Sequence, residues 1–419
     1  MGTHPLLDEL DARGLVHDST DRDALAARLA EGPITLYCGF DPTADSLHVG
    51  HLVPLLMLRR FLDAGHRPIA LAGGATGMVG DPSGRSTERN LLDASTLAAN
   101  IAAIKEQLTA ILGEGGWLLE DNARWSGDVR LLDFLRDVGK YVTVNQMVAK
   151  ESVKARMESE NGISFTEFSY MLLQAYDFLV MHGDPALGCE LQIGGSDQWG
   201  NITLGIDLIR RHTGRAAYGL TCPLIVRSDG KKFGKSEEGN VWLSAERTSP
   251  YQFFQYFINV PDADVGRFLR LFTFLRLDEI AAVEEASAAD PSARIGQRTL
   301  ARELTATVHG SAAAAAAEEA STVLFGGSPL SASPGAFELL AGEVPTTALE
   351  NGASAVDLAL AAGLVASKSD GRRAVDQGGL YLNGERLAAD RSVAGDDLVH
   401  GRYALLRRGK NKYALVVAP

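Results

Sequence analysis

The chain has 419 residues, 46% of them hydrophobic, and a formal net charge of −13 at neutral pH. This length and apolar content predict more than one domain, each with its own hydrophobic core. The three cysteines, Cys38, Cys189 and Cys222, are too scattered for a metal cluster or a disulfide framework, and because we find neither a signal peptide nor an apolar stretch long enough to span a membrane, we expect a cytoplasmic protein with no membrane partner.

The first strongly patterned region begins with the apolar, β-prone run Ile34–Phe40, which leads into the segment Asp41–His51. An amphipathic pattern follows, so we expect a strand, a loop and then a helix at Leu47–Ala64. Pro54 lies within this predicted helix and would kink it, unless the regular helix begins near His51 and the proline falls in its first turn. The sequence leaves both helix starts open.

Two histidines, His48 and His51, lie three residues apart at the start of that helix. They would project from one face toward the helix N-terminus, where backbone N–H groups and the helix dipole favour an anion. Gly50 between them lets a flat ring approach the backbone. The alternative is that both histidines are surface or capping residues, which this segment by itself does not exclude.

Two further segments are typical of strands that end in loops. Ile69–Asp81 predicts a buried strand that runs into a glycine-rich loop, and because its glycines do not match GxGxxG we do not expect a dinucleotide site. Leu191–Trp199 predicts a strand end, a glycine turn and a helix start. Open α/β sheets bind their ligands at such places.

Between these two segments, Ser164–Val180 is apolar nearly all round, which predicts a buried helix. Tyr170, Gln174 and Asp177 form one polar stripe along it, at positions i, i+4 and i+7. Buried polar groups need partners. The stripe therefore either bonds a neighbouring element or binds a small polar ligand with an amine at one end and a hydroxyl at the other.

The motif Lys231–Ser236 lies in a charged, glycine-containing segment that follows a strand-like run, Leu224–Val226, as expected of a loop. Lys232 and Lys235 supply two ammonium groups that can follow charge onto a departing pyrophosphate. The segment is not a P-loop, because the first glycine of that motif would have to stand at position 229, which is Asp229. A solvated lysine-rich turn is the alternative.

The chain is then helix-rich from about 240 to 325. This region includes the alanine run Ala312–Ala317, which forms helix readily and to which we assign no chemistry. Residues 326–352, with their Pro, Ser and Gly, are typical of a linker.

The end of the chain is a separate basic unit. From Ser367 onward, 10 lysines and arginines stand against 6 acidic residues, although the chain as a whole is acidic. The pattern predicts helices near 354–364 and 369–377 and strands around 380–382 and 403–406. Clustered cations bind nucleic-acid phosphates, while a merely solvated charged surface is the alternative. The clustered cations are Arg372, Arg373, Arg407, Arg408, Lys410 and Lys412.

Taken together, the histidine motif His48–His51 and the lysine motif Lys232–Ser236 resemble the two signature motifs of class I aminoacyl-tRNA synthetases. The surrounding sequence is similar to the bacterial tyrosyl members over essentially the whole chain. The resemblance implies an α/β fold with a Rossmann-like nucleotide-binding catalytic domain built on a parallel sheet, then an α-helical domain and a small α+β S4-like RNA-binding domain. The implied bounds are 1–225 for the catalytic domain with a helical dimer-contact insertion at about 125–160, 226–325 for the signature loop and anticodon-side helices, 326–352 for the linker, and 353–419 for the S4-like domain.

The resemblance also implies the roles of individual residues. Catalysis would depend on Thr43, His48, His51, Lys232, Lys235 and Ser236. Tyrosine would be bound by Tyr37, Asp81, Tyr170, Gln174, Asp177 and Gln192. ATP would be bound by Gly39, Asp41, His48, Gly50, His51, Gly195, Asp197, Gln198 and Lys235.

We therefore expect a homodimeric enzyme that activates L-tyrosine with ATP and Mg²⁺ and passes the tyrosyl group to the 3′-terminal ribose of tRNA(Tyr), with no metal held by the protein itself. The tyrosine carboxylate is the attacking group, so catalysis depends on positioning and electrostatic stabilisation. Asp177 and Tyr37 would bond the phenolic hydroxyl, and phenylalanine would leave both groups unpaired. Tyrosyl enzymes are the usual example of rejection by this effect without an editing domain.

Two other interpretations remain. A tryptophanyl enzyme of related architecture would not need Asp177 facing Tyr37, because indole offers its donor at a different position. A non-catalytic RNA-binding protein on a decayed synthetase scaffold would keep the basic tail but could lose the signature histidines and lysines, all of which are present.

Overall fold

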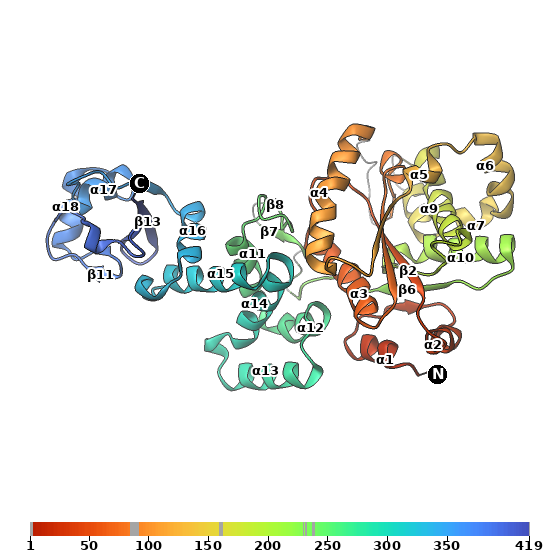
Figure 1. Cartoon of the computed structure of the whole chain (residues 1–419), viewed down its shortest axis with the longest axis horizontal. Helices are drawn as coiled ribbons and strands as arrows, with labels where there is room; N and C mark the ends of the chain where they lie inside the picture. Colours follow the sequence, from red (N-terminus) through yellow and green to blue (C-terminus); the bar gives the residue numbers. More distant parts are fainter. Residues whose placement is uncertain are drawn as a thin grey trace. The chain divides into compact units, whose positions relative to one another are not determined.

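The structure of the chain is a computed structural model that describes residues 3–83, 92–158, 162–228, 230, 233–236 and 239–418, with the backbone alone at Lys235 and Ser236. The chain forms two compact units, one of residues 1–244 and 261–296 and the other of residues 245–260 and 297–419. Figure 1 labels many of the helices and strands of both units. No helix in these described ranges is long and apolar enough to cross a membrane.

Strands and helices alternate along most of the first unit. Its strands are β1 (Asp18–Ser19), β2 (Thr35–Phe40), β3 (Arg67–Ala72), β4 (Leu118–Asp121), β5 (Cys189–Gly195), β6 (Tyr218–Cys222), β7 (Lys235–Ser236) and β8 (Gly239–Asn240). Its helices are α1 (Pro5–Ala12), α2 (Arg22–Ala30), α3 (Leu52–Asp63), α4 (Ala94–Leu112), α5 (Ala123–Ser126), α6 (Leu131–Asp137), α7 (Val144–Val148), α8 (Glu151–Met157), α9 (Phe165–Gly183), α10 (Trp199–Thr213), α12 (Asp262–Phe272) and α13 (Leu277–Ala289). Short 3₁₀ turns near the site are η1 (Val49–His51), η2 (Thr76–Met78) and η4 (Ser196–Gln198).

The main sheet of this unit is parallel in the order β6-β5-β2-β3-β4, and β1 pairs antiparallel with β6 at the edge. Helices α3 and α4 lie on one side of the sheet and α9 and α10 on the other (Figure 1). The loops after β2, β3 and β5 therefore begin at the same edge of the sheet, the one formed by the carboxyl ends of its parallel strands. Sheets of this kind bind ligands at that edge. The predicted Rossmann-like fold is confirmed.

The helix after the histidine motif begins later than Leu47, so that part of the prediction is wrong. Residues 49–51 form the turn η1, and α3 begins at Leu52. Pro54 is then the third residue of α3, where a missing N–H removes no helical hydrogen bond. The structure thus selects the start near His51, in which the proline needs no kink.

The strand expected at Leu224–Val226 is also wrong. β6 ends at Cys222, and Leu224 and Val226 are 55% and 60% exposed. Pro223 follows β6 directly and cannot donate to a sheet, which explains why pairing stops there.

The second unit combines helices with a smaller sheet. Its helices are α11 (Pro250–Ile258), α14 (Ile295–His309), α15 (Ser311–Leu324), α16 (Pro334–Glu343), α17 (Ala355–Ala361) and α18 (Lys368–Asp376). Its strands are β9 (Thr346–Ala348), β10 (Leu380–Leu382), β11 (Glu385–Arg386), β12 (Tyr403–Arg408) and β13 (Lys412–Val417), in the order β11-β10-β12-β13-β9. The predicted helices and strands of the basic tail correspond to α17, α18, β10 and β12, and the alanine run lies in α15.

Both faces of the small sheet are buried. On β12, Ala404 and Leu406 pack in one core with residues of α17 and α18, whereas Tyr403 and Leu405 pack in another with Phe337 of α16. This alternation is the period of two that a strand imposes on its side chains.

Residues 326–352, expected to be a linker, belong to this packed unit. Phe337 and Leu340 of α16 are fully buried, and β9 pairs in parallel with β13. The residues that resemble a linker are helix-start residues: Ser333 is the N-cap of α16, its side chain accepts from Ala336 N, and Pro334 is the first helical residue.

Candidate active site

The two signature segments lie side by side, joined by backbone hydrogen bonds through residues 241–243. Leu243 N donates to Leu47 O over 2.8 Å, and Val49 N donates to Val241 O over 3.0 Å. Val241 N in turn donates to Gly234 O over 3.0 Å. Gly234 has a φ of +83°, and a Cβ there would lie 3.1 Å from Val49 Cγ2, so glycine is the residue that fits this approach.

Part of the lysine motif cannot be placed. Lys232 lies outside the described residues, and the side chains of Lys235 and Ser236 do too, although their backbone forms β7 against β8. Their roles stay predictions. Gly234, directly before Lys235, contacts the histidine motif, so the chain that carries Lys235 passes beside it.

The two histidines come together, and they do so as caps of η1: His48 is its N-cap and His51 completes the capping box, which is the capping role that the alternative gave them. Their ring centroids are 4.1 Å apart. His48 Nδ1 accepts the N–H of Gly50 over 3.0 Å, and His51 Nδ1 accepts the N–H of His48 over 3.2 Å. Because Nδ1 is the acceptor in each ring, the proton of the neutral imidazole is on Nε2, which is a donor. A Cβ at Gly50 would lie 2.7 Å from the His48 ring, so this glycine permits the arrangement.

Three predicted residues lie at the carboxyl end of β2: Gly39 within the strand, and Asp41 and Thr43 just after it. Gly39 is exposed, and no described atom lies within 4 Å of the place a Cβ would take, which leaves room for a ligand. Asp41 faces the loop after β3, since its Oδ1 would be 2.6 Å from a Cβ at Gly73. Thr43 is exposed, and its N–H donates to Asp41 O over 2.8 Å.

Asp177 of α9 is buried and bonded on both oxygens. Trp125 Nε1 donates to Oδ1 over 2.7 Å, and Asn122 Nδ2 donates to Oδ2 over 2.9 Å. Burial raises the pKa of Asp177 to about 7, although the two donors lower it. Burial, and then the Asp177 charge, raise the pKa of Tyr37 well above its ordinary value. Both groups therefore lie in a dry environment, where an unmade hydrogen bond is costly.

Tyr37 and Gln192 each carry a buried polar atom that the described residues leave unsatisfied. They stand in register on β2 and β5, so their side chains leave the same face of the sheet. Tyr37 is 1% and Gln192 2% exposed, yet neither Tyr37 Oη nor Gln192 Oε1 has a hydrogen-bond partner in the described part of the chain. Such atoms are rare in folded proteins. A polar ligand that carries a hydroxyl would satisfy them.

A second polar cluster lies where α9 and α10 approach the loop after β3. Gln198 Nε2 donates to Asp81 Oδ2 over 2.7 Å. Asn201 Nδ2 donates to Gln198 Oε1 over 3.1 Å and to Gln174 Oε1 over 3.0 Å. Asp81, like Tyr170 on α9, is buried. The carboxylate and amide oxygens gathered here suit an ammonium group.

Asp197 extends this cluster toward Gly195. Burial, and then the charge of Asp81, raise the pKa of Asp197. Its Oδ1 would lie 2.6 Å from a Cβ at Gly195, so the glycine makes space for the carboxylate. Within the described ranges, no group of three or more His, Cys, Asp or Glu residues could hold a metal ion.

Three residues of the site were missed by the sequence analysis: Asn122, Trp125 and Asn201. Asn122 also ties the loop after β3 to the site, because its Oδ1 accepts from Ala75 N over 2.7 Å and its Nδ2 donates to Thr76 Oγ1 over 2.9 Å. The available signal was position: Asn122 and Trp125 directly follow β4 at the same carboxyl edge.

The six cations predicted to bind RNA differ in their surroundings. Arg372 and Arg373 are exposed, and Arg373 pairs with Asp370. Arg408 also bonds Asp370, at 2.9 Å, and donates to Leu364 O over 3.0 Å, so it holds the fold together. The other three line one cavity: Arg407, Lys410 and Lys412.

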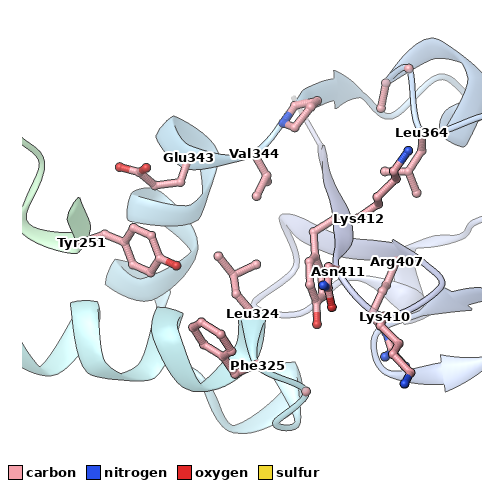
Figure 2. A pocket seen from close by; sticks show the side chains of 15 residues that line it. Tyr251, Leu324, Phe325, Glu343, Val344, Leu364, Arg407, Lys410, Asn411 and Lys412 are labelled. Atoms are coloured by element: carbon pink, nitrogen blue, oxygen red, sulfur yellow. The ribbon is translucent and has the colours of Figure 1, made fainter. Parts of the chain in front are cut away.

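That cavity lies in the second unit and measures about 820 Å³. Figure 2 shows the three cations on one side of it and Tyr251, Phe325 and Glu343 on the other. Phe325 is 78% exposed. An exposed aromatic ring opposite clustered cations is typical of single-stranded nucleic-acid binding.

The chain matches two family models. Residues 29–326 match the class I tRNA synthetases of the tryptophan and tyrosine group, and residues 336–416 match the C-terminal domain of SYY-like tyrosine–tRNA ligases. A tyrosine–tRNA ligase of Opitutus terrae is 53% identical, with 98% of this chain and 99% of the relative covered. One of Geobacillus stearothermophilus is 50% identical over the same shares. The solved structure of a C-terminally truncated mitochondrial tyrosyl-tRNA synthetase of Aspergillus nidulans superposes with a TM-score of 0.69 at 34% identity, covering 76% of this chain and 94% of that one.

Proposed function

The chain belongs to the class I tRNA synthetases, as a member of the tyrosine–tRNA ligases, and we propose that the residues gathered at the carboxyl edge of its sheet carry out tyrosine activation. The phenolic hydroxyl of the substrate lies between Tyr37 and Asp177. Its ammonium group lies among Asp81, Tyr170 and Gln174. One observation carries this proposal: among the described residues, the buried hydroxyl of Tyr37 has no hydrogen-bond partner, and it lies near a buried carboxylate.

In the first step, the tyrosine carboxylate attacks the α-phosphorus of ATP, the bond to the β-phosphate oxygen breaks, and pyrophosphate leaves with the electron pair. Charge builds on the α-phosphate oxygens and on the leaving group. We propose that His48 and His51 donate from Nε2 to this charge, that Lys232 and Lys235 follow it, and that Mg²⁺ arrives with ATP. Thr43 and Ser236 support the phosphates, and Asp41, Gly39, Gly50, Gly195, Asp197 and Gln198 surround the nucleotide. Gln192 lines the pocket that holds the tyrosine.

In the second step, a ribose hydroxyl at the 3′ end of tRNA attacks the carbonyl carbon of tyrosyl-adenylate. The mixed anhydride bond breaks and AMP leaves, while the hydroxyl proton passes to the released phosphate or to solvent. No side chain forms a covalent bond in either step, so positioning accounts for catalysis.

The test of this proposal is Tyr37→Phe, assayed by tyrosine-dependent exchange of pyrophosphate into ATP. The variant removes one partner of the substrate hydroxyl, so kcat/KM for tyrosine should fall about tenfold while the weak exchange with phenylalanine stays the same. Tyr218→Phe, on β6 of the same sheet, is the matched control. Equal discrimination in the native chain and Tyr37→Phe would remove Tyr37 from the proposal.

We propose a homodimer as well, formed through the region of α6 and α7. Leu131, Leu132 and Val144 are 71%, 77% and 62% exposed there. Exposed apolar side chains on two successive helices favour an interface, and a second copy is the partner we propose. Leu132→Glu should convert the dimer to a monomer in light scattering after gel filtration, and a native-like dimer of this variant would contradict the assignment.

We propose that residues 1–225, together with the signature loop that follows them, bind the small substrates and that the S4-like part, 353–419, binds tRNA(Tyr) in the cytoplasm. The cavity lined by Arg407, Lys410 and Lys412 supports this (Figure 2). Lys410→Ala should weaken tRNA binding and lower the salt dependence of the affinity, without changing pyrophosphate exchange. An unchanged salt dependence would place the RNA elsewhere.

A further inference from the structure

Helix α12 has not yet been given a role. It is hydrogen-bonded to the chain just before the lysine motif. Ser228 donates to Asp264 Oδ2 twice, from its N–H and from its hydroxyl, each over 2.8 Å. Arg267 donates to Asp264 Oδ1 over 3.1 Å and also to the carbonyl of Val226. Val226 and Ser228 are therefore held by the first two turns of α12.

The same helix also holds the chain where it reappears at Phe233. The Phe233 ring stacks on Phe272, with centroids 5.2 Å apart and planes at 15°, and meets Phe268 edge-on at 5.3 Å. Phe233 is buried. Asp264, Phe268 and Phe272 are spaced by four residues, so they form one stripe along α12. One helix face thus holds the chain both before and after residues 229–232.

The far end of α12 is fixed to the helix that begins at the histidine motif. Arg60 of α3 donates to the carbonyl of Thr273, and Arg13 donates to the same carbonyl over 3.3 Å. Both guanidiniums are buried. These hydrogen bonds hold helices α3 and α12 together. His51 lies at the start of α3 and Asp264 near the start of α12.

Asp264 itself is suited to this task. It is 3% exposed, and it lies at the third residue of α12, where the helix dipole stabilises a negative charge. Both of its oxygens accept hydrogen bonds. Oδ2 accepts from Ser228, which precedes the lysine motif, and Oδ1 accepts from Arg267. A buried carboxylate is costly unless it is bonded in this way.

We propose that Asp264 is a positioning residue for tyrosine activation: by holding Ser228, it sets where the chain that carries Lys232 and Lys235 meets the phosphates. The inference depends on the proposed roles of those two lysines. It does not involve the residues of the proposed tyrosine pocket, which come from β2, β5, α9 and the loop after β3.

The test compares Asp264→Asn with the native chain in single-turnover formation of tyrosyl-adenylate, in its reversal by pyrophosphate, and in equilibrium binding of tyrosine. The amide cannot accept from Ser228 and from Arg267 together. We expect the forward and reverse rates to fall together by about tenfold, because both share one transition state, while tyrosine affinity stays within about twofold. Asp278→Asn, in the first turn of α13, is the control for loss of an acidic residue at a helix start.

Ser228 provides a second test if Asp264→Asn fails to fold. Ser228→Ala should slow activation by about threefold, and Ser228→Thr, which keeps the hydroxyl, should restore the rate. Native activation rates in Asp264→Asn, or rates that fall only together with tyrosine affinity and Tm, would overturn the inference. Lys232→Ala and Lys235→Ala distinguish failure of this inference from failure of the proposed function. If both lysine variants activate tyrosine normally, the proposed roles of the lysines fail. If the lysine variants are slow and Asp264→Asn is not, only the inference about Asp264 fails.

Discussion

Replacing Trp125 by phenylalanine removes one donor from Asp177 and keeps an aromatic ring in its place. In the native chain the indole N–H donates to Asp177 Oδ1 over 2.7 Å and lowers the pKa of a carboxyl that burial raises to about 7. A hydrogen bond to a charged group contributes about 1.5–3 kcal/mol, and about 1.4 kcal/mol corresponds to one pH unit. The pKa of Asp177 should therefore be roughly one to two pH units higher in Trp125→Phe.

The assay is the pH profile of kcat/KM for tyrosine in pyrophosphate exchange, which reports ionisation of the free enzyme. The phenolic hydroxyl is a donor and needs the ionised carboxylate, so activity should be lost as the pH falls through the pKa of Asp177. This acid limb should lie near pH 7 in the native chain and roughly one to two pH units higher in Trp125→Phe. At pH 7.5 the variant should be about three- to twenty-five-fold less active, and the deficit should shrink toward pH 8.5.

Trp117→Phe is the matched control, since that indole donates over 2.7 Å to Gly113 O, which is not one of the site residues. Its pH profile should match that of the native chain. A loss in Trp125→Phe that is the same at every pH from about 6.5 to 8.5 would refute the reasoning, because ionisation of Asp177 would then not limit tyrosine binding.

Two further changes test the surroundings of the pocket. Asn201→Ala removes the donor that Gln174 Oε1 and Gln198 Oε1 share, so KM for tyrosine should rise about three- to tenfold with kcat nearly unchanged; an unchanged KM would show that the amide is not needed to orient its neighbours. Arg156→Met leaves the buried Glu167 without the guanidinium 2.7 Å away and should lower the free energy of unfolding by about 3–5 kcal/mol. Thermal unfolding would show this as a fall in Tm, and a native-like Tm would mean that the pair adds nothing to stability.

The sequence predicted the sheet and the polar stripe well, for physical reasons. Apolar runs such as Ile34–Phe40 have the composition of buried parallel strands, and an interrupted pattern such as Tyr170, Gln174 and Asp177 has the period of one helix face. The spacing of two histidines placed both rings at one helix start. Local patterns of this kind need no knowledge of distant parts of the chain.

What the sequence did not predict depends on contacts between distant segments. Nothing local tells that Trp125 donates to Asp177, 52 residues away, or that Ser228 bonds Asp264. The helix start at Leu52 was undecided because Leu47 pairs with Leu243, which takes residues 47–51 out of the helix. The prediction of a linker at residues 326–352 was wrong because the pattern of Ser333 and Pro334 is typical of a helix start as well as of a loop.

The most direct test of the account is exchange of pyrophosphate into ATP by the purified protein without tRNA, with tyrosine, phenylalanine and tryptophan as parallel substrates. The account predicts rapid exchange with tyrosine and at most trace exchange with the other two, because only tyrosine carries the hydroxyl that we propose Tyr37 and Asp177 to bond. Comparable exchange with phenylalanine would contradict the account of specificity. No exchange with any of the three would contradict the catalytic role of the site.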